Sequence, residues 1–504
     1  MEQHAEKVIE ISSKARYFHD RCWGFQIYNG STQCTRGPSK TRTNTIDIRS
    51  LSRVLHVDTD ERVALVEPNV PMAKLVAATL PYDLIPPVIT GLPSLTAGSA
   101  YTDTSGASSS FRHGFFDRTV NWIEIVSANG QVMRASTTEN ADLFYGAAAS
   151  LGTLGIVTLL EIQLVPAKPY VRLEYRPVSS VSQAISGIQR YTTDTDCQYL
   201  DGIMYSRDKG VLCAGYLSDR PAESTSVQRF TRLTDPWFYI HAEEISSRGN
   251  PAEEYIPLVD YLSRYDHGGF WAGKWALDNL FHVSPMYHTM HKGGHFGKNT
   301  IQNVAVPYKN AHELIDHLDD SFGRYPIWLC PVRQATSSPD GLKVHGLMAQ
   351  LHPTESTLKD PKILLSIGTW GPRPGTEKGF GEFDRSVERK VLTLGGQKWP
   401  YAGTYYTEEE FWSLYDQKHS EQLRRKYNAT YLPTLYEESR VRIAEQGWME
   451  MWLLSGLYGL IHSAVRTEYL LGQKKRLNVI SGDMAAWFIF LVAGLYYVVT
   501  GGGI

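Results

Sequence analysis

The stretch of residues 95–157 decides the fold of this chain. It opens with LTAGS at residues 95–99, continues with TSGASSS at residues 104–110 and ends with GTLGIV at residues 152–157. Glycine lets a backbone approach a ligand closely, and Ser and Thr supply hydroxyls and turns. Successive backbone N–H groups in such turns form concavities that bind anions. The pattern suits a pyrophosphate, although it is neither a G-x-G-x-x-G fingerprint after a strand nor a Walker A loop. By composition alone, a surface loop rich in Gly and Ser explains it as well.

Composition excludes several classes of protein. A chain of 504 residues is too long for one core, so two or three domains are expected. Hydrophobic content of 42% and charged content of 20% are typical of a folded protein. A net charge of −3 gives no indication of a nucleic-acid partner. The five cysteines are scattered and form no C-x-x-C pair, which indicates a reducing compartment without disulfides or a zinc site.

The C-terminus differs from the rest of the chain. Residues 484–504 carry no charge, and such a length can span a hydrocarbon core as a helix. Because Lys474-Lys475-Arg476 lies just upstream, the positive-inside tendency predicts a membrane anchor with the preceding body in the cytosol. A buried C-terminal helix is the alternative. Residues 451–465 form a shorter apolar run, which we expect to be interfacial or packed against protein. Residues 1–11 are polar, so no signal peptide is expected at the start of this sequence.

Hydrophobic patterning predicts two differently built domains. The first combines a helix at residues 71–80 and another at 138–150 with strands at 62–70 and 155–164 and a hairpin at 121–136 around Asn129-Gly130. After residue 169 we expect a sheet backed by helices. Its predicted strands are 198–205, 210–217, 362–370 and 397–406, and its predicted helices are 181–191 and 383–394.

Islands of sequence outside the opening stretch carry a family resemblance. They include PNVPM at residues 68–72, LFY at 143–145, IQLVPAK at 162–168, EEYIPL at 253–258, YPIWLCP at 325–331 and EEFW at 409–412. With residues 95–157, they resemble the Δ24-sterol reductase (Diminuto/seladin) family, within the vanillyl-alcohol-oxidase-type FAD-binding superfamily. The islands keep the family's order from about residue 30 to about residue 440.

The resemblance implies a fold and a division into domains. The implied fold class is α+β, with a two-subdomain FAD-binding domain of the PCMH type and an antiparallel-sheet substrate domain. Residues 1–170 would form the FAD-binding domain and residues 171–407 the substrate or cap domain. Residues 408–440 would return to the FAD domain, and residues 441–504 would form a C-terminal membrane-associated tail.

The resemblance also implies which residues bind the cofactor. Carried over by position, they are Thr96, Gly98, Ser99, Thr104, Ser108, Ser109, Gly114, Gly152, Gly155, Ile156, Arg424 and Lys426. The family has Gly where Ser99, Asp103 and Ser105 stand, and Glu where Ala107 stands. Because a carboxylate near a phosphate repels it, Asp103 is expected to point outward or to bind ribose.

Covalent attachment of the flavin needs a His or Cys at its edge. His113 and Cys34 are the nearby options, and neither sits in the arrangement of the covalently flavinylated relatives. The prediction is therefore non-covalent FAD. His282, His288, His291 and His295 lie close in sequence, but no carboxylate or thiolate falls inside the run 288–295, so no metal is expected there.

The catalytic residues predicted are Tyr401 and Tyr405, on a strand that by resemblance faces the flavin. A phenol can donate a proton, although aromatic packing explains these residues as well. The resemblance implies that NADPH reduces the flavin, which then reduces an alkene of a sterol or another lipophilic isoprenoid, at the endoplasmic reticulum membrane. Two alternatives are a natural-product flavoprotein that oxidises or cyclises its substrate and a non-catalytic membrane scaffold of the same fold.

Overall fold

The computed structural model describes residues 1–30, 43–103, 105–219, 221, 227–232, 235–266, 299–333, 363–372, 381–399 and 403–441. Thr104, Tyr401, Cys34 and the four clustered histidines lie outside these ranges. So do the shorter apolar run at residues 451–465 and the predicted anchor at residues 484–504. Within the described ranges, no helix combines the length and the apolar character that a membrane crossing requires.

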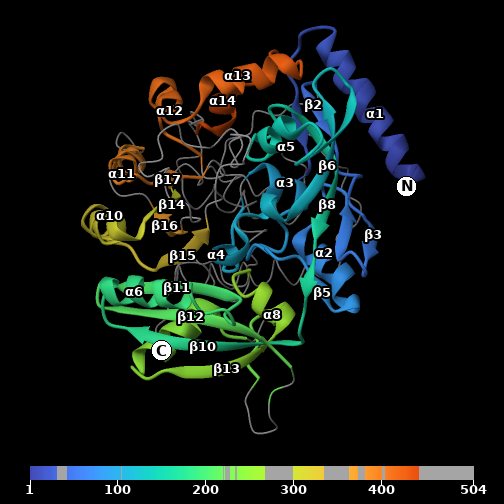
Figure 1. The fold of residues 1–504 in the computed structure, drawn as a ribbon. Helices are drawn as coiled ribbons and strands as arrows, with labels where there is room; N and C mark the ends of the chain where they lie inside the picture. The colour runs from blue at the N-terminus through green and yellow to red at the C-terminus, as the bar shows by residue number, and fades with distance from the viewer. Residues whose placement is uncertain are drawn as a thin grey trace, which may run out of the picture.

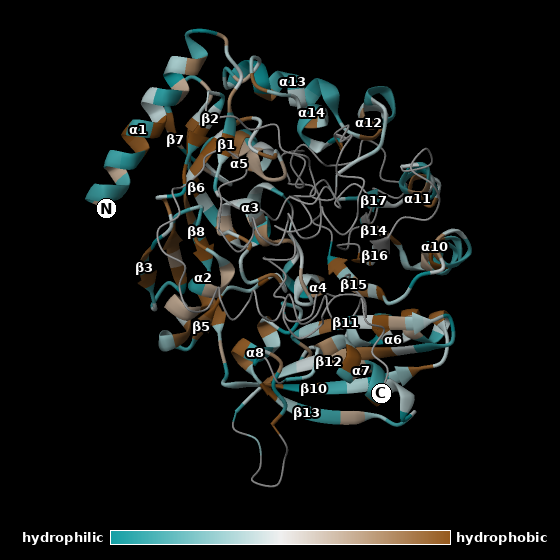
Figure 2. Ribbon diagram, turned by 180° about the vertical axis from the view of Figure 1, so that it is seen from behind, coloured by the Kyte–Doolittle hydropathy of each residue, from teal (hydrophilic) through white to brown (hydrophobic). Residues whose placement is uncertain are grey.

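The first part of the chain folds around a five-stranded antiparallel sheet with the strand order β3-β4-β8-β6-β7. Its strands are β3 (Val54–Asp58), β4 (Val63–Val66), β6 (Val120–Ser127), β7 (Val132–Ser136) and β8 (Gly155–Gln163). The predicted hairpin at residues 121–136 and the predicted strand at 155–164 are thereby confirmed. In Figure 2, hydrophobic residues gather on β6 and β8, as expected for a sheet that packs on both faces.

Smaller elements surround this sheet. A parallel pair joins β1 (Gln26–Tyr28) to β2 (Thr45–Asp47), and β5 (Leu84–Ile85) pairs with β9 (Val165–Pro166). The helices are α1 (Glu2–His19), α2 (Met72–Thr79), α3 (Ala97–Thr102), α4 (Ser110–His113) and α5 (Ala141–Ala147). The predicted helix at residues 71–80 is confirmed as α2. The predicted helix at 138–150 begins later, because Asn140 adopts a left-handed conformation with φ 47°.

The second part forms an eight-stranded antiparallel sheet with the order β13-β10-β12-β11-β15-β16-β14-β17. Its strands are β10 (Tyr170–Val178), β11 (Tyr199–Ser206), β12 (Lys209–Ser218), β13 (Ala252–Pro257), β14 (Asn299–Pro307), β15 (Ile327–Arg333), β16 (Ile363–Pro372) and β17 (Gln397–Lys398). Its helices are α6 (Val181–Tyr191), α7 (Phe238–Ser247), α8 (Leu258–Leu262), α10 (Tyr308–Ser321) and α11 (Glu382–Thr393). The predicted α+β class with an antiparallel second sheet is confirmed.

Both faces of the large sheet are covered. Leu212 and Ala214 of β12 join a core with α6, α10 and α11, while Val211 and Cys213 join a separate core with α7 and α8. This division follows from the period of two residues along a strand. Figure 1 shows the two parts of the molecule with α4 between them.

The chain then returns to the first sheet. Helices α12 (Glu408–Leu414), α13 (Gln417–Lys426) and α14 (Leu435–Ser439) contribute Phe411, Leu423 and Leu435 to the core that contains α1 and the five-stranded sheet. Their placement agrees with the expected return at residues 408–440. The domain boundaries themselves stay predictions.

A buried charge joins α1 to the five-stranded sheet. His4 lies between Glu67 and Glu124, with Nδ1 3.0 Å from Glu67 Oε1 and Nε2 3.2 Å from Glu124 Oε1. These hydrogen bonds, to Glu124 and then to Glu67, raise the pKa of His4 from 6.5 to about 9. The imidazole is therefore protonated at neutral pH.

We expect His4→Ala to lower the free energy of unfolding by about 3 kcal/mol at pH 6, because a shift of one pKa unit corresponds to about 1.4 kcal/mol. The folded-state pKa is raised, so this contribution is complete below pH 6.5 and is lost as the pH rises through about 9. Denaturant unfolding from pH 6 to pH 10 measures it. The two proteins should converge as the pH rises, and parallel curves would contradict the assignment.

Candidate functional site

The two segments that the sequence singled out lie against each other. The backbone N–H of Ala149 donates to the carbonyl oxygen of Tyr101 at 3.3 Å, and that of Leu151 donates to Thr102 at 3.2 Å. Thus the end of α3 supports the turn that leads into β8. Separate pieces of the opening stretch build one site.

This turn has an unusual backbone. Ala149, Leu151 and Gly152 have φ angles of 58°, 54° and 80°. Left-handed conformations of residues other than glycine cost of order 1–3 kcal/mol and cluster at functional sites. A Cβ at Gly152 would lie 2.6 Å from Ile27 Cδ1. Position 152 therefore requires glycine for both its φ angle and its contact with β1.

At the start of α3, backbone N–H groups are already bonded to acceptors of the protein itself. The N–H groups of Ala97 and Gly98 donate to the carbonyl oxygens of Val70 (2.9 Å) and Pro68 (2.7 Å), and the side chain of Thr96 accepts from Ser99 N. Ser99 Oγ also accepts from Asn29 Nδ2 at 3.2 Å. The structure thus gives Thr96, Gly98 and Ser99 a role in fixing α3, and direct contact with a cofactor stays a prediction.

Gly98 is the tightest point of this arrangement. A Cβ there would lie 2.6 Å from Pro68 Cβ and 2.9 Å from Pro68 O. Overpacking typically costs about 1–3 kcal/mol, so we expect Gly98→Ala to lower stability by this amount and to lower flavin content. Thermal unfolding and the flavin-to-protein absorbance ratio measure both effects. Wild-type stability and flavin content in Gly98→Ala would refute the explanation.

The loop that follows α3 offers unpaired donors. Among the described residues, the backbone N–H groups of Gly106, Ser108 and Ser109 donate to no protein acceptor. Ser109 Oγ is buried and also has no partner there. Ser105 and Ala107, by contrast, donate their N–H groups to Ala100 O and Ser110 Oγ. Clustered free N–H groups and an orphan hydroxyl fit an anionic group such as a pyrophosphate.

The same loop contacts two strands of the large sheet and the residue that follows a third. Leu200 N in β11 donates to Ser108 O at 2.8 Å, and the thiol of Cys330 in β15 donates to Ala107 O at 3.3 Å. The ring of Phe115 meets Trp399, directly after β17, at a centroid distance of 4.6 Å. Position 107 is therefore a buried alanine at the junction of the two domains.

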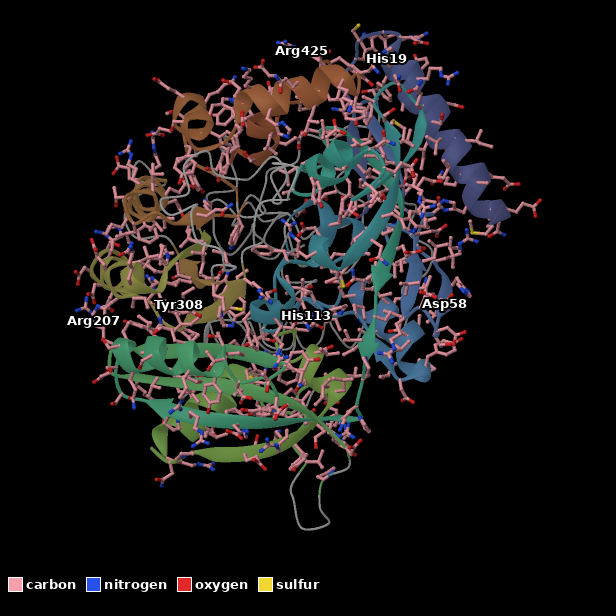
Figure 3. All side chains as sticks on the ribbon, in the orientation of Figure 1. His19, Asp58, His113, Arg207, Tyr308 and Arg425 are labelled. Carbon is pink, nitrogen blue, oxygen red and sulfur yellow. The ribbon has the colours of Figure 1, made fainter. Side chains whose placement is uncertain are left out.

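Short helix α4 and its neighbours complete the junction. The Arg112 guanidinium donates to the carbonyl oxygens of Asp194, at 3.0 Å, and of Cys197 and Thr195. Figure 3 shows the labelled His113 between the two parts of the molecule. Burial first, then Arg112 and Arg333, lower the pKa of His113. Gly114 has φ 74°, and a Cβ there would lie 3.1 Å from Arg118 Cγ, so this position favours glycine.

Asp103 ends α3. Its N–H donates to Ser99 O at 2.9 Å, and its carboxylate accepts from Thr102 Oγ1 at 3.0 Å. The carboxylate thus has a partner on its own helix. Whether it turns outward or meets a ribose stays a prediction.

The predicted strand at residues 397–406 is mostly wrong. Among the described residues of this stretch, Gln397 and Lys398 pair with β14 and Thr404 forms an isolated bridge with Arg440, so Tyr405 lies in a loop and not on a strand. Its backbone N–H donates to Glu388 Oε1 at 3.0 Å, and its ring lies against Gly381. Trp399, two residues before Tyr401, places this part of the chain beside the loop of residues 105–116.

Arg424 and Lys426 lie on α13 and bind segments that adjoin this helix. The buried Arg424 guanidinium donates to the carbonyl oxygens of Thr430, Leu432 and Pro433 at 2.6–3.1 Å. Lys426 Nζ lies 2.6 Å from Asp142 Oδ2, at the start of α5. The contact of Lys426 thus joins α13 to α5, the helix that leads into the turn at residues 149–152, whereas Arg424 binds the segment that follows α13. Cofactor binding by either residue stays a prediction.

The cross-domain contacts of Arg112, Cys330 and Trp399 were not predicted from the sequence. Each joins residues more than 80 positions apart, so no local pattern marks them. Trp399 does fall in a predicted strand, and Cys330 falls in one of the islands that carry the family resemblance. Their contact with the loop is visible only in the folded chain.

Comparison with known proteins agrees with this geometry. A family model described as an FAD binding domain matches residues 4–136, which include the loop and α3. The chain is 28% identical over 411 residues to the Δ24-sterol reductase of Homo sapiens, covering 77% of this chain and 76% of that protein. It is 28% identical over 457 residues to the Δ24-sterol reductase of Arabidopsis thaliana, covering 80% and 79%. The chain is thus similar to Δ24-sterol reductases over most of its length and carries an FAD-binding domain, which supports this family and an FAD-dependent oxidoreductase. The predicted family and enzyme class are confirmed.

Proposed function

We propose that this enzyme reduces a carbon–carbon double bond of a sterol or another lipophilic isoprenoid, with NADPH as the electron donor. One observation carries the proposal: the loop of residues 105–116, with its unpaired N–H groups, lies directly on β11 and β15 of the large sheet. A flavin held by this loop would meet a substrate at the junction of the two domains. The similarity to proteins named Δ24-sterol reductase supports the choice of substrate class.

The residues present fit a flavin dinucleotide. The N–H groups of Gly106, Ser108 and Ser109 and the hydroxyl of Ser109 would hold the pyrophosphate, and the turn at residues 149–152 would lie beside it. We infer non-covalent binding, so acid precipitation should release the flavin into the supernatant. Flavin that stays on the denatured chain would refute this mode of binding.

The chemistry requires an acid. When bound, the flavin supplies a hydride. An isolated trisubstituted alkene accepts hydride poorly, so a proton must reach the other alkene carbon before or during the transfer. The protein must place a donor within hydrogen-bond reach of that carbon, and we propose Tyr401 or Tyr405 for this role. The apolar contacts around Phe115 and Trp399 would exclude water from the same region.

A changed reaction is the second candidate, because of position 107. The family has Glu there, whereas this chain has a buried Ala107 whose carbonyl accepts from Cys330. A carboxylate is therefore missing at the domain junction. Oxidation of the substrate by O₂, or cyclisation without net redox change, would proceed without NADPH, and turnover with and without NADPH separates the candidates.

The deciding experiment has two anaerobic steps. Addition of NADPH to the purified yellow protein should bleach the flavin absorbance, and a sterol with a side-chain alkene should then restore it. Bleaching without recovery on any isoprenoid alkene would refute alkene reduction. A colourless protein that releases no flavin would favour a non-catalytic scaffold.

We also propose that residues 484–504 anchor the enzyme in the endoplasmic reticulum membrane with its body in the cytosol. The support is the uncharged run that follows Lys474-Lys475-Arg476, and a lipophilic substrate suits this location. Deletion of residues 484–504 should move the protein into the soluble fraction. Unchanged fractionation would refute the anchor.

A further inference from the structure

The buried carboxylate of Glu388 binds residues that precede and residues that follow Tyr401 in the sequence. Glu388 of α11 is completely buried, and Lys398 Nζ donates to its Oε1. The same oxygen accepts from Thr404 Oγ1 at 3.3 Å and from Tyr405 N at 3.0 Å. Through Glu388, Lys398 is thus joined to Thr404 and Tyr405, which follow it in the chain.

Further bonds close this arrangement. Lys398 Nζ also donates to Gly403 O at 2.9 Å, and the hydroxyl of Tyr406 donates to Glu388 O at 3.2 Å. Lys398 and residues 403–406 are therefore joined to one another and to α11. Next to Lys398, Trp399 contacts Phe115 of the loop of residues 105–116.

We propose that Glu388 is a positioning residue, whose charged carboxylate holds Lys398 and the segment of residues 403–405 on α11, next to the Trp399 that contacts the loop of residues 105–116, and thereby sets the rate of proton transfer to the substrate. The proposal rests on the proposed function, because it acts through Tyr401 or Tyr405. Glu388 itself cannot reach a substrate, since it is completely buried and its oxygens are occupied by Lys398, Thr404 and Tyr405.

The surroundings of Glu388 make its binding of Lys398 and of the backbone N–H of Tyr405 sensitive to pH. Burial raises the pKa of Glu388 to about 7, against the opposing effect of Lys398. The other groups that face the pair are Asp384 on α11, Thr404, and the hydroxyls of Tyr406 and Tyr415, the last of which donates to Lys398 O. Above pH 7 the carboxylate is charged and binds the ammonium and the N–H donors. Below pH 7 it is protonated, and the segment loses its charged anchor.

The test separates proton transfer from flavin reduction. In Glu388→Gln, anaerobic reduction of the flavin by NADPH should be unchanged, whereas reoxidation by the alkene should slow on the order of 10²-fold, the typical result of a misplaced catalytic group. The dependence of reoxidation on pH near 7 should disappear in this variant. Glu388→Asp should recover part of the rate. Glu382→Gln, at the exposed start of the same helix, is the matched control and should behave as the wild type.

A second measurement needs neither substrate nor a disruptive variant. Hydrogen exchange of peptides covering residues 399–406, corrected for the intrinsic pH dependence, should be faster in Thr404→Val than in the wild type. It should also become faster in the wild type below pH 7. Equal exchange in both comparisons, or an unchanged pH profile in Glu388→Gln, would overturn the proposal. If no alkene reoxidises the wild-type flavin, the proposed function fails, while the exchange data still decide whether Glu388 holds the segment.

Discussion

Loss of a single hydroxyl, in Tyr401→Phe or Tyr405→Phe, should slow alkene reduction on the order of 10²–10⁴-fold, the usual effect of removing a general acid. A phenol with an ordinary pKa of about 10 is protonated at neutral pH and can donate. Trp399, two residues before Tyr401 in the sequence, contacts Phe115 of the loop of residues 105–116, and Glu388 accepts from the backbone N–H of Tyr405. Phenylalanine preserves most of the packing, so flavin content should not change.

Turnover and flavin content of both variants provide the measurement. Tyr436→Phe is the matched control, because its hydroxyl donates to the backbone oxygen of Tyr406 at 3.3 Å in the same region but is not proposed to meet a substrate. It should turn over at a near-normal rate. Near-normal rates in both Tyr401→Phe and Tyr405→Phe would leave packing as the role of these residues, and another group would have to supply the proton.

The largest expected loss of stability comes from Arg264→Met. Arg264 Nη2 lies 2.7 Å from Asp201 Oδ2, and both side chains are buried, with exposures of 4% and 0%. Tyr265 also donates its hydroxyl to Asp201 Oδ2 at 2.9 Å. Removal of one partner leaves an uncompensated buried charge, which costs about 3–5 kcal/mol. Flavin retention should fall as well, because Leu200, next to Asp201, binds the carbonyl of Ser108.

Denaturant unfolding at neutral pH measures this effect. The double variant Asp201→Asn/Arg264→Met removes both charges and should recover much of the lost stability, because the penalty arises from the unpaired carboxylate. If the double variant is as unstable as Arg264→Met, packing and not charge explains the loss. If Arg264→Met is as stable as the wild type, the pair contributes nothing.

Sequence patterns predicted the local elements well where neighbouring residues determine them. The hairpin around Asn129-Gly130, strand β8 and helices α2 and α6 all follow from periodicity and turn residues. The predicted strand at residues 397–406 failed for a tertiary reason. After Lys398 the backbone leaves β14, and the N–H of Tyr405 bonds to the side chain of Glu388 instead of to another strand.

For the candidate site as well, the sequence predicted the local features, and the tertiary structure decided the rest. Small residues at 95–110 and 152–157 indicated a nucleotide site in the sequence, since glycine and serine are needed wherever a backbone must approach a phosphate. Which N–H groups are unpaired was not predictable. The groups of Ala97 and Gly98 are occupied by Val70 and Pro68, and only the folded chain shows that those of Gly106 and Ser109 are not.

The sequence by itself thus determined the class of fold and the FAD-binding family, because periodicity, turn residues and short motifs are local properties of a chain. The tertiary structure decided the pairing of buried charges. His4 binds Glu67 and Glu124, and Asp201 binds Arg264, across 63 or more residues in every case. From a sequence alone, a charged residue is expected to be exposed. Whether it is buried, and which partner compensates the cost of its desolvation, depends on segments that only folding brings together.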